Sequence, residues 1–196
     1  MFNQLVSAFK GGLVFPVITR TTLEPWISGL GGLVGLALVL FIAQSTLGLE
    51  SAAALVASMG ASAVLLFAVP HGPLSQPWPL LGGHTLSALI GVACAQWLPE
   101  ANLAAVLAVG LAIGSMQVLR CIHPPGGATA LSAVVGGGAV HDLGFMYVLT
   151  PVLLNALCLV LVAFLFNAPL SWRRYPAAWK PNLAVARSDD RAHERA

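Results

Sequence analysis

The residues best suited to binding a charged solute gather at one corner of the sequence, between two apolar segments. Arg120, His123 and Thr129 flank a run of two prolines and two glycines, Pro124–Gly127. The prolines predict an extended turn, and the glycines permit close backbone approach. We expect a helix to begin here, where free N–H groups and the positive end of the helix dipole favour an anion.

A second glycine pair, Gly82-Gly83, opens an earlier apolar segment in a similar way. If the two helix starts face one another, together they favour an anion over a cation. Arg120 adds a permanent charge, and His123 adds a donor that titrates. The residues predicted to bind substrate are Arg120, His123, Gly126, Gly127, Thr129, Gly83, His84 and Thr85.

Structural roles compete with these assignments. Arg120 at a helix end also suits an interfacial anchor, and His123 also suits a cap of the corner. His84 lies inside an apolar segment, where a polar group is costly unless it has a partner. Asn155 is expected only to bond a neighbouring helix.

The elements that must position these residues are apolar segments. Of the 196 residues, 58% are hydrophobic and 8% are charged, which predicts an all-α, polytopic transmembrane bundle. The fifth segment below is short and glycine-rich, so it is either a shielded span or a re-entrant half-helix. The six predicted segments are Ile27–Gly48, Ser51–Val69, Leu81–Leu98, Ala101–Leu119, Gly126–Val140 and Leu143–Asn167.

The distribution of charge supports six crossings with both termini in the cytoplasm. Glu50, Glu100 and Asp142 then fall in the three outer turns, and every basic residue falls on the inner side. This predicts an N-terminal cytoplasmic or interfacial segment (1–24), a transmembrane domain (25–170) and a basic, polar cytoplasmic tail (171–196). With no convincing secretory signal, the pattern favours the inner membrane of a bacterium.

The similar starts of the third and fifth segments also predict an internal repeat. The first segment carries its own glycine pair, Gly31-Gly32. The chain is then three helical hairpins, related as parallel repeats about an axis along the membrane normal.

What the sequence lacks argues against several classes of function. It has no basic stripe with interleaved aromatics, so nucleic acid is not an expected partner. No carboxylate or thiolate stands at ligand spacing from the histidines, so neither a metal nor a cofactor is expected. No serine–histidine or paired-carboxylate pattern is evident in the sequence, which argues against an enzyme.

The run IHPPGGATAL, within its six apolar segments, resembles the HPP family of small integral membrane proteins, named after the His-Pro-Pro triplet. The resemblance covers about residues 20–170 and includes the segment Pro70–Trp78 with the Gly-Gly-His that follows. It implies a transport protein, because family members in chloroplasts and cyanobacteria are associated with nitrite movement.

The prediction for function is a transporter or channel for a small inorganic anion, with nitrite favoured by the resemblance. A carrier of another small organic anion and a non-transporting assembly protein remain as alternatives. Because six short spans make a thin wall around any pathway, we also expect a homo-oligomer.

Overall fold

The computed structural model describes residues 23–170 and 172–178, and this part of the chain is helical, without a β-strand. The predicted all-α fold class is confirmed. In chain order the elements are α2 (Glu24–Ala68), η1 (Pro73–Ser75, a 3-10 turn), α3 (Pro77–Trp97), α4 (Ala101–Val118), α5 (Pro124–Val135), α6 (Gly138–Leu143), η2 (Val148–Leu153, a π-helical turn) and α7 (Leu154–Asn167). Most of the predicted N-terminal segment and C-terminal tail lies outside the described residues.

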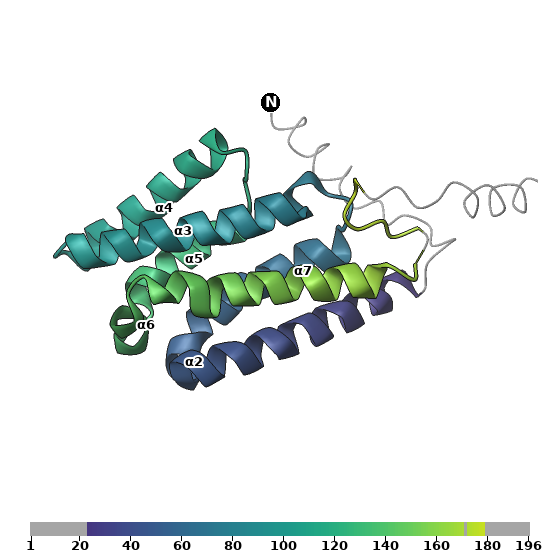
Figure 1. Ribbon diagram of the computed structural model, residues 1–196, viewed down its shortest axis with the longest axis horizontal. Helices are drawn as coiled ribbons and strands as arrows, with labels where there is room; N and C mark the ends of the chain where they lie inside the picture. The colour runs from purple at the N-terminus through teal and green to yellow at the C-terminus, as the bar shows by residue number, and fades with distance from the viewer. Residues whose placement is uncertain (1–22, 171, 179–196) are drawn as a thin grey trace, which may run out of the picture.

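The helix α2 is a hairpin rather than a single rod (Figure 1). Its helical geometry breaks at Gly48, where φ is 73° and ψ is 166°, a left-handed conformation that favours glycine. Gly35 in the first half lies against Phe67 in the second, and Gly60 lies against Leu36. The two halves are therefore antiparallel, as the first two predicted segments require.

In the part of the chain that the structure describes, four helical segments are long and apolar enough to cross a membrane: α2, α3, α4 and Val148–Asn167, which comprises η2 and α7. The third predicted segment begins too late, since α3 starts at Pro77. Pro77 and Pro79 fall in the first turn, where a missing N–H costs little, so this stretch is helix rather than loop.

The fifth predicted segment is divided in the structure. The helix α5 has 12 residues, about 18 Å of helix at 1.5 Å per residue, and α6 follows after Gly136 and Gly137. Pro124 and Pro125 form the first turn of α5 rather than the extended turn that we predicted, again because proline is tolerated at helix starts.

The sixth predicted segment contains a break that hydropathy does not reveal. Thr150, directly before Pro151, has extended backbone angles (φ −137°, ψ 115°) inside the π-helical turn η2. Regular α-helix resumes at Leu154. A proline inside a helix removes a hydrogen bond and disturbs the preceding residue, so Pro151 was the available signal.

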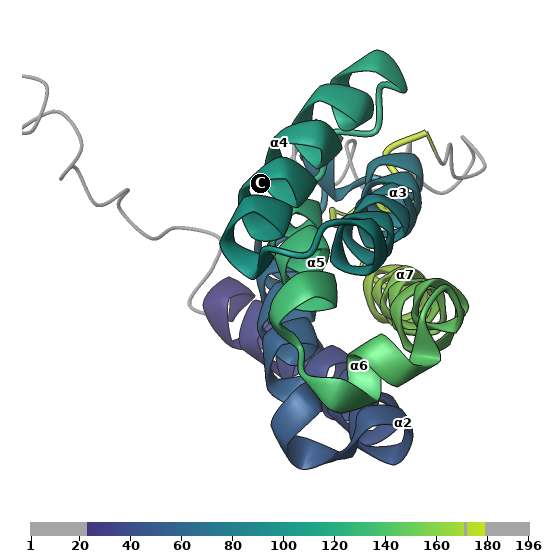
Figure 2. The same ribbon diagram turned by 90° about the vertical axis from the view of Figure 1, so that its left-hand side faces the viewer.

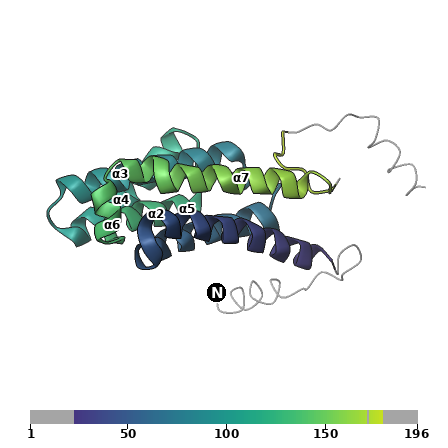
Figure 3. The same cartoon turned by 60° about the horizontal axis from the view of Figure 1, so that its bottom comes forward.

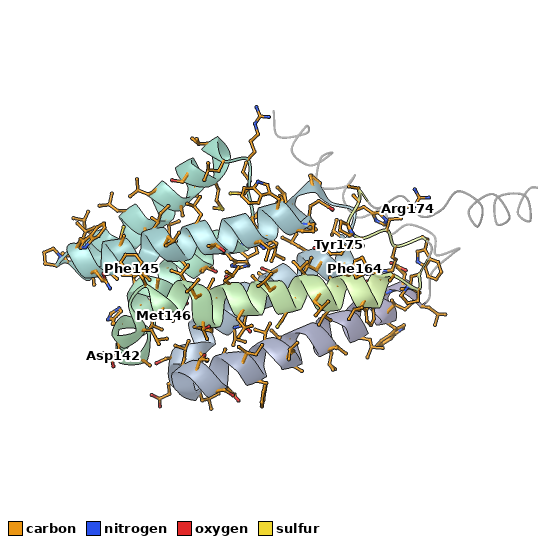
Figure 4. All side chains as sticks on the ribbon, viewed as in Figure 1. Asp142, Phe145, Met146, Phe164, Arg174 and Tyr175 are labelled. Atoms are coloured by element: carbon orange, nitrogen blue, oxygen red, sulfur yellow. The ribbon has the colours of Figure 1, made fainter. Side chains whose placement is uncertain are left out.

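The charged residues separate to the two ends of the bundle. The turn at Gly48, the α3–α4 turn and α6 lie at one end, and they carry the exposed Glu50, Glu100 and Asp142. Arg173 and Arg174 lie at the opposite end together with Glu24, and Arg120 follows α4 near the start of α3, where the Trp78 indole donates to the Leu119 carbonyl. Figure 4 shows this separation directly, with Asp142 and Arg174 labelled far apart. The internal repeat and the membrane side of each end stay predictions.

The short helix α5 lies at the centre of the bundle and contacts α2, α3 and α4 (Figure 2). The helix α7 runs beside α2 along its length (Figure 3). Large apolar side chains cover the outside, for example Val106 (71% exposed) and Val118 (81% exposed). An apolar exterior around a packed interior is what a lipid environment requires.

Candidate functional site

Two histidine rings face each other inside this apolar bundle. His84 comes from the second turn of α3, and His123 is the N-cap residue of α5. Their ring centroids are 4.9 Å apart with an interplanar angle of 62°, and neither side chain has exposed surface. An ionisable side chain in such a position is a candidate functional residue by default.

One serine hydroxyl joins the two rings. Ser62 Oγ, from the second half of α2, lies 2.8 Å from His84 Nε2 and 2.9 Å from His123 Nε2. The other ring nitrogen of His123, Nδ1, lies 2.8 Å from the carbonyl oxygen of Leu74. Ser62 is therefore a bridge between helices α3 and α5.

The hydrogen bonds continue from His84 into α5. His84 Nδ1 is 2.7 Å from Thr129 Oγ1, which is 2.7 Å from Ser58 Oγ. Ser58 in turn donates to the carbonyl oxygen of Pro125 at 2.7 Å. We call the five connected side chains the histidine cluster: Ser58, Ser62, His84, His123 and Thr129.

Glycines bring the helices close enough for these bonds to form. A Cβ atom at Gly83 would stand 2.6 Å from His123 Cβ, and one at Gly126 would stand 2.9 Å from Ser87 Oγ. Both contacts are closer than real Cβ atoms approach. Gly83 and Gly126 thus let α3 pack directly against α5, in agreement with the role of small residues in membrane bundles. Close approach was predicted for Gly126 and Gly127, and Gly126 makes it, whereas a Cβ at Gly127 would meet only Val109 Cγ1 at 3.9 Å.

The structure gathers five of the eight predicted site residues and leaves three aside. His84, His123, Thr129, Gly83 and Gly126 meet at the buried α3–α5 contact. Arg120 is exposed, has φ of 53°, and its side chain has no partner among the described residues. Thr85 is half-buried outside the cluster, and Gly127 borders an open apolar groove of about 570 Å³ between α4 and α5.

The start of α5 offers fewer backbone donors than an ordinary helix start. Pro124 and Pro125 have no N–H group, and the N–H of Gly126 donates to the carbonyl of His123 at 2.8 Å. The chemistry of this corner therefore resides in its side chains more than in its backbone.

Sequence reasoning missed both serines of the histidine cluster. Ser58 and Ser62 lie 22 or more residues from their partners in sequence, so no local motif points to them. Their spacing of four residues inside an apolar segment was the available signal, since it places both hydroxyls on one helix face.

Asn155, on α7, departs from its predicted role. It is fully buried, and neither Nδ2 nor Oδ1 has a hydrogen-bond partner among the described residues. The expectation that it bonds a neighbouring helix is not met, and buried polar atoms are costly in this state.

A second polar group lies at the basic end of the bundle. Arg173 is 1% exposed and pairs with Glu24 at 2.7 Å. Its guanidinium also donates to Asn167 Oδ1, Ser28 Oγ and the Phe67 carbonyl. We call this group the Arg173 clasp, because it ties both ends of α2 to the end of α7. From the sequence, Arg173 was counted only among the basic residues predicted to lie on the inner side.

Comparison with known proteins places the chain in a family. The family model described as "HPP, transmembrane region" matches residues 17–176. Two curated relatives from Dictyostelium discoideum, both named as transmembrane proteins, are 38% identical over 91% of this chain and 37% identical over 79%. The chain covers 58% and 54% of their lengths, a little over half. No solved structure matches.

Proposed function

Because the chain belongs to the HPP transmembrane family, we propose that it is a membrane transporter for a small inorganic anion, with nitrite as the first substrate to test. One observation carries this proposal: two buried imidazoles share a serine hydroxyl inside a bundle with an apolar exterior. Ionisable groups in such positions mark solute and proton pathways.

The composition of the histidine cluster favours a negative solute. It contains hydroxyl and ring N–H groups, which donate hydrogen bonds, and it contains no carboxylate. The carboxylates of the described residues lie at the ends of the bundle: Glu24, Glu50, Glu100 and Asp142. A cation pathway would be expected to place acidic side chains or carbonyl groups near its centre.

Nitrite itself comes from the resemblance to family members associated with nitrite movement. The histidine cluster supports only that the solute is small and negatively charged. The exposed guanidinium of Arg120, at the basic end, would raise the local anion concentration there, an effect that salt screens.

Because the two rings have no exposed surface, a solute reaches them only when neighbouring helices separate. We therefore favour a carrier that alternates between conformations. The smooth α3–α5 contact at Gly83 and Gly126 is the surface along which such movement would occur.

The separation of charges supports a six-crossing topology with the basic end in the cytoplasm. We place the protein in a bacterial inner membrane and expect a homo-oligomer, which native mass spectrometry of the protein in lipid nanodiscs would detect.

The test is anion flux into proteoliposomes of the purified protein, comparing nitrite, nitrate, chloride and formate. Alkaline buffers suppress leakage of uncharged nitrous acid through the lipid. We expect nitrite flux that His84→Gln and His123→Gln each abolish, because glutamine keeps a polar side chain but does not titrate. His71→Gln is the matched control, since His71 is exposed and outside the histidine cluster.

Equal flux in all three variants would remove the histidine cluster from the pathway. The absence of flux for all four anions would overturn the proposed transport of inorganic anions. The organic-anion carrier and the assembly protein would then be the remaining alternatives.

A further inference from the structure

The hydrogen bonds of the histidine cluster require one proton more than two neutral histidines hold. From this count we infer that His84, Ser62 and His123 form a relay for a single proton, and that each anion moves together with one proton. The inference rests on the proposed function, because it specifies how the same site handles charge.

At one end of this series of hydrogen bonds only one donor direction is possible. The carbonyl oxygen of Pro125 only accepts, so the Ser58 hydroxyl must donate to it. Ser58 has no second proton, so Thr129 donates to Ser58. Thr129 has then used its proton, so His84 must donate from Nδ1.

The donor direction is also fixed at the other end of this series of hydrogen bonds. The carbonyl oxygen of Leu74 only accepts, so His123 must donate from Nδ1. A neutral imidazole has one N–H, so both Nε2 atoms would then be acceptors. Both face Ser62 Oγ, at 2.8 and 2.9 Å, and Ser62 has one proton to give. A longer contact of 3.3 Å to the Ser58 carbonyl competes for that proton.

The series comprises six contacts: Ser58 with the Pro125 carbonyl, Thr129 with Ser58, His84 with Thr129, His123 with the Leu74 carbonyl, and Ser62 with each ring. With two neutral rings, only five of these contacts have a proton to form a hydrogen bond. With one added proton, all six form, in two equivalent arrangements. In the first, His84 Nε2–H donates to Ser62 and Ser62 donates to His123. In the second, His123 Nε2–H donates to Ser62 and Ser62 donates to His84.

Exchange between these arrangements is balanced proton transfer through one hydroxyl. The N–H bond of one ring breaks as its proton passes to Ser62 Oγ. The former Ser62 O–H bond breaks as that proton passes to the other ring. Ser62 ends with one proton, and the positive charge has moved from one helix to another.

The added proton has no fixed negative partner in the described part of the chain. The other titratable or charged groups on the surrounding elements are Glu24, Arg173 and Glu50 on or against α2, His71 before η1, Cys94 on α3, Glu100 at the start of α4, Arg120 and Cys121 before α5, His141 and Asp142 on α6, Tyr147 beside Ser132, and Cys158 on α7. None is hydrogen-bonded to either ring. A lone buried charge is strongly disfavoured, so a small anion supplies the missing charge.

The experiment measures nitrite uptake and internal pH together in proteoliposomes. Both compartments are alkaline, with the outside the less alkaline, and empty liposomes give the leak. We expect one proton to enter with each nitrite, and uptake to follow the pH difference but not a potential imposed with potassium and valinomycin. Nitrite uptake without protons, or uptake driven by the potential, would overturn the inference while leaving nitrite transport intact.

Variants of the bridging serine separate the relay from a packing role. We expect Ser62→Ala to lower coupled uptake roughly ten- to a hundredfold, since the charged state loses a hydrogen bond to an imidazolium. Ser62→Thr should restore much of it by returning the hydroxyl. Ser115→Ala, on α4 outside the histidine cluster, should match the parent protein. Full coupling in correctly folded Ser62→Ala would refute the relay.

The relay can also be tested without measuring transport, so that failure of the relay and failure of the proposed function give different results. Nuclear magnetic resonance of ¹⁵N-histidine protein, assigned with the His84→Gln and His123→Gln variants, follows both rings during a pH titration. A shared proton makes both rings respond in the same first step, and Ser62→Ala should separate the two responses. Independent titration of the rings in the parent protein would overturn the relay even if no anion is transported.

Discussion

A single methyl group at Gly83 tests whether the α3–α5 contact determines the geometry of the histidine cluster. In Gly83→Ala, the new Cβ would lie 2.6 Å from His123 Cβ and 3.1 Å from the carbonyl oxygen of Cys121. Neither atom is the far end of a flexible side chain, so the segment before α5 must move. Forced insertion of a methyl group into a packed contact costs about 1–3 kcal/mol.

The matched control is Gly110→Ala on α4, where a Cβ would meet nothing within 4 Å. Alanine is a better helix former than glycine by about 0.5–1 kcal/mol, and this gain applies to both variants. We therefore expect Gly110→Ala to be neutral or stabilising and Gly83→Ala to be destabilised relative to it by the overpacking term.

Thermal unfolding in detergent compares the two variants, and nitrite flux reports the cluster. A difference of about 2 kcal/mol corresponds to roughly 4–8 °C for a protein of this size. Displacement of His123 also lengthens its 2.9 Å bond to Ser62, so flux should fall in Gly83→Ala alone. Equal unfolding temperatures and equal flux in the two variants would show that the α3–α5 contact accommodates a methyl group without cost, which would contradict the prediction.

Three further perturbations follow from the polar groups outside the cluster. Arg173→Gln leaves Glu24 without its ion-pair partner and should cost about 3 kcal/mol, whereas exposed Arg174→Gln should leave the unfolding temperature unchanged. Asn155→Leu should hold or raise that temperature, because both polar atoms of Asn155 lack hydrogen-bond partners among the described residues; a clear loss of stability would contradict this expectation. The N–H groups of Asn102 and Leu103 lower the pKa of Glu100 below its usual value, so this cap stabilises the fold above the ordinary carboxyl pKa and is lost as pH falls through the lowered one. Melting curves against pH should therefore show less acid sensitivity in Glu100→Gln than in the parent.

The sequence predicts the helical segments well where hydropathy alone decides. The turn after the first segment falls at Gly48, the residue whose left-handed backbone reverses α2. The segment Ala101–Leu119 matches α4 to within one residue. Errors occur at prolines: Pro77 and Pro124 begin helices that we predicted to start later, and Pro151 sits beside an unpredicted break.

The candidate site was likewise predicted only in part from the sequence. His84, His123 and Thr129 were predicted from their residue types and from the glycines beside them, and the structure brings them together. Ser62 was not predicted, because its role arises only when α2 packs against α3 and α5. Arg120 was included for its proximity in sequence, yet the turn that carries it directs its side chain away from the core.

The Arg173 clasp bears on the order in which the protein is completed during synthesis. Glu24 and Arg173 are separated by 149 positions. During synthesis, the ion pair of Glu24 therefore cannot form until nearly the whole domain has been translated. Until then the described part of the chain offers Glu24 no ion-pair partner, and the Phe67 carbonyl and Asn167 Oδ1 lack the guanidinium that later donates to them. A nascent chain interrupted before position 173 would already contain all the helices that the structure describes, while the Arg173 clasp had not yet formed. We expect quality-control proteases to distinguish such chains from complete ones because the Arg173 clasp is missing.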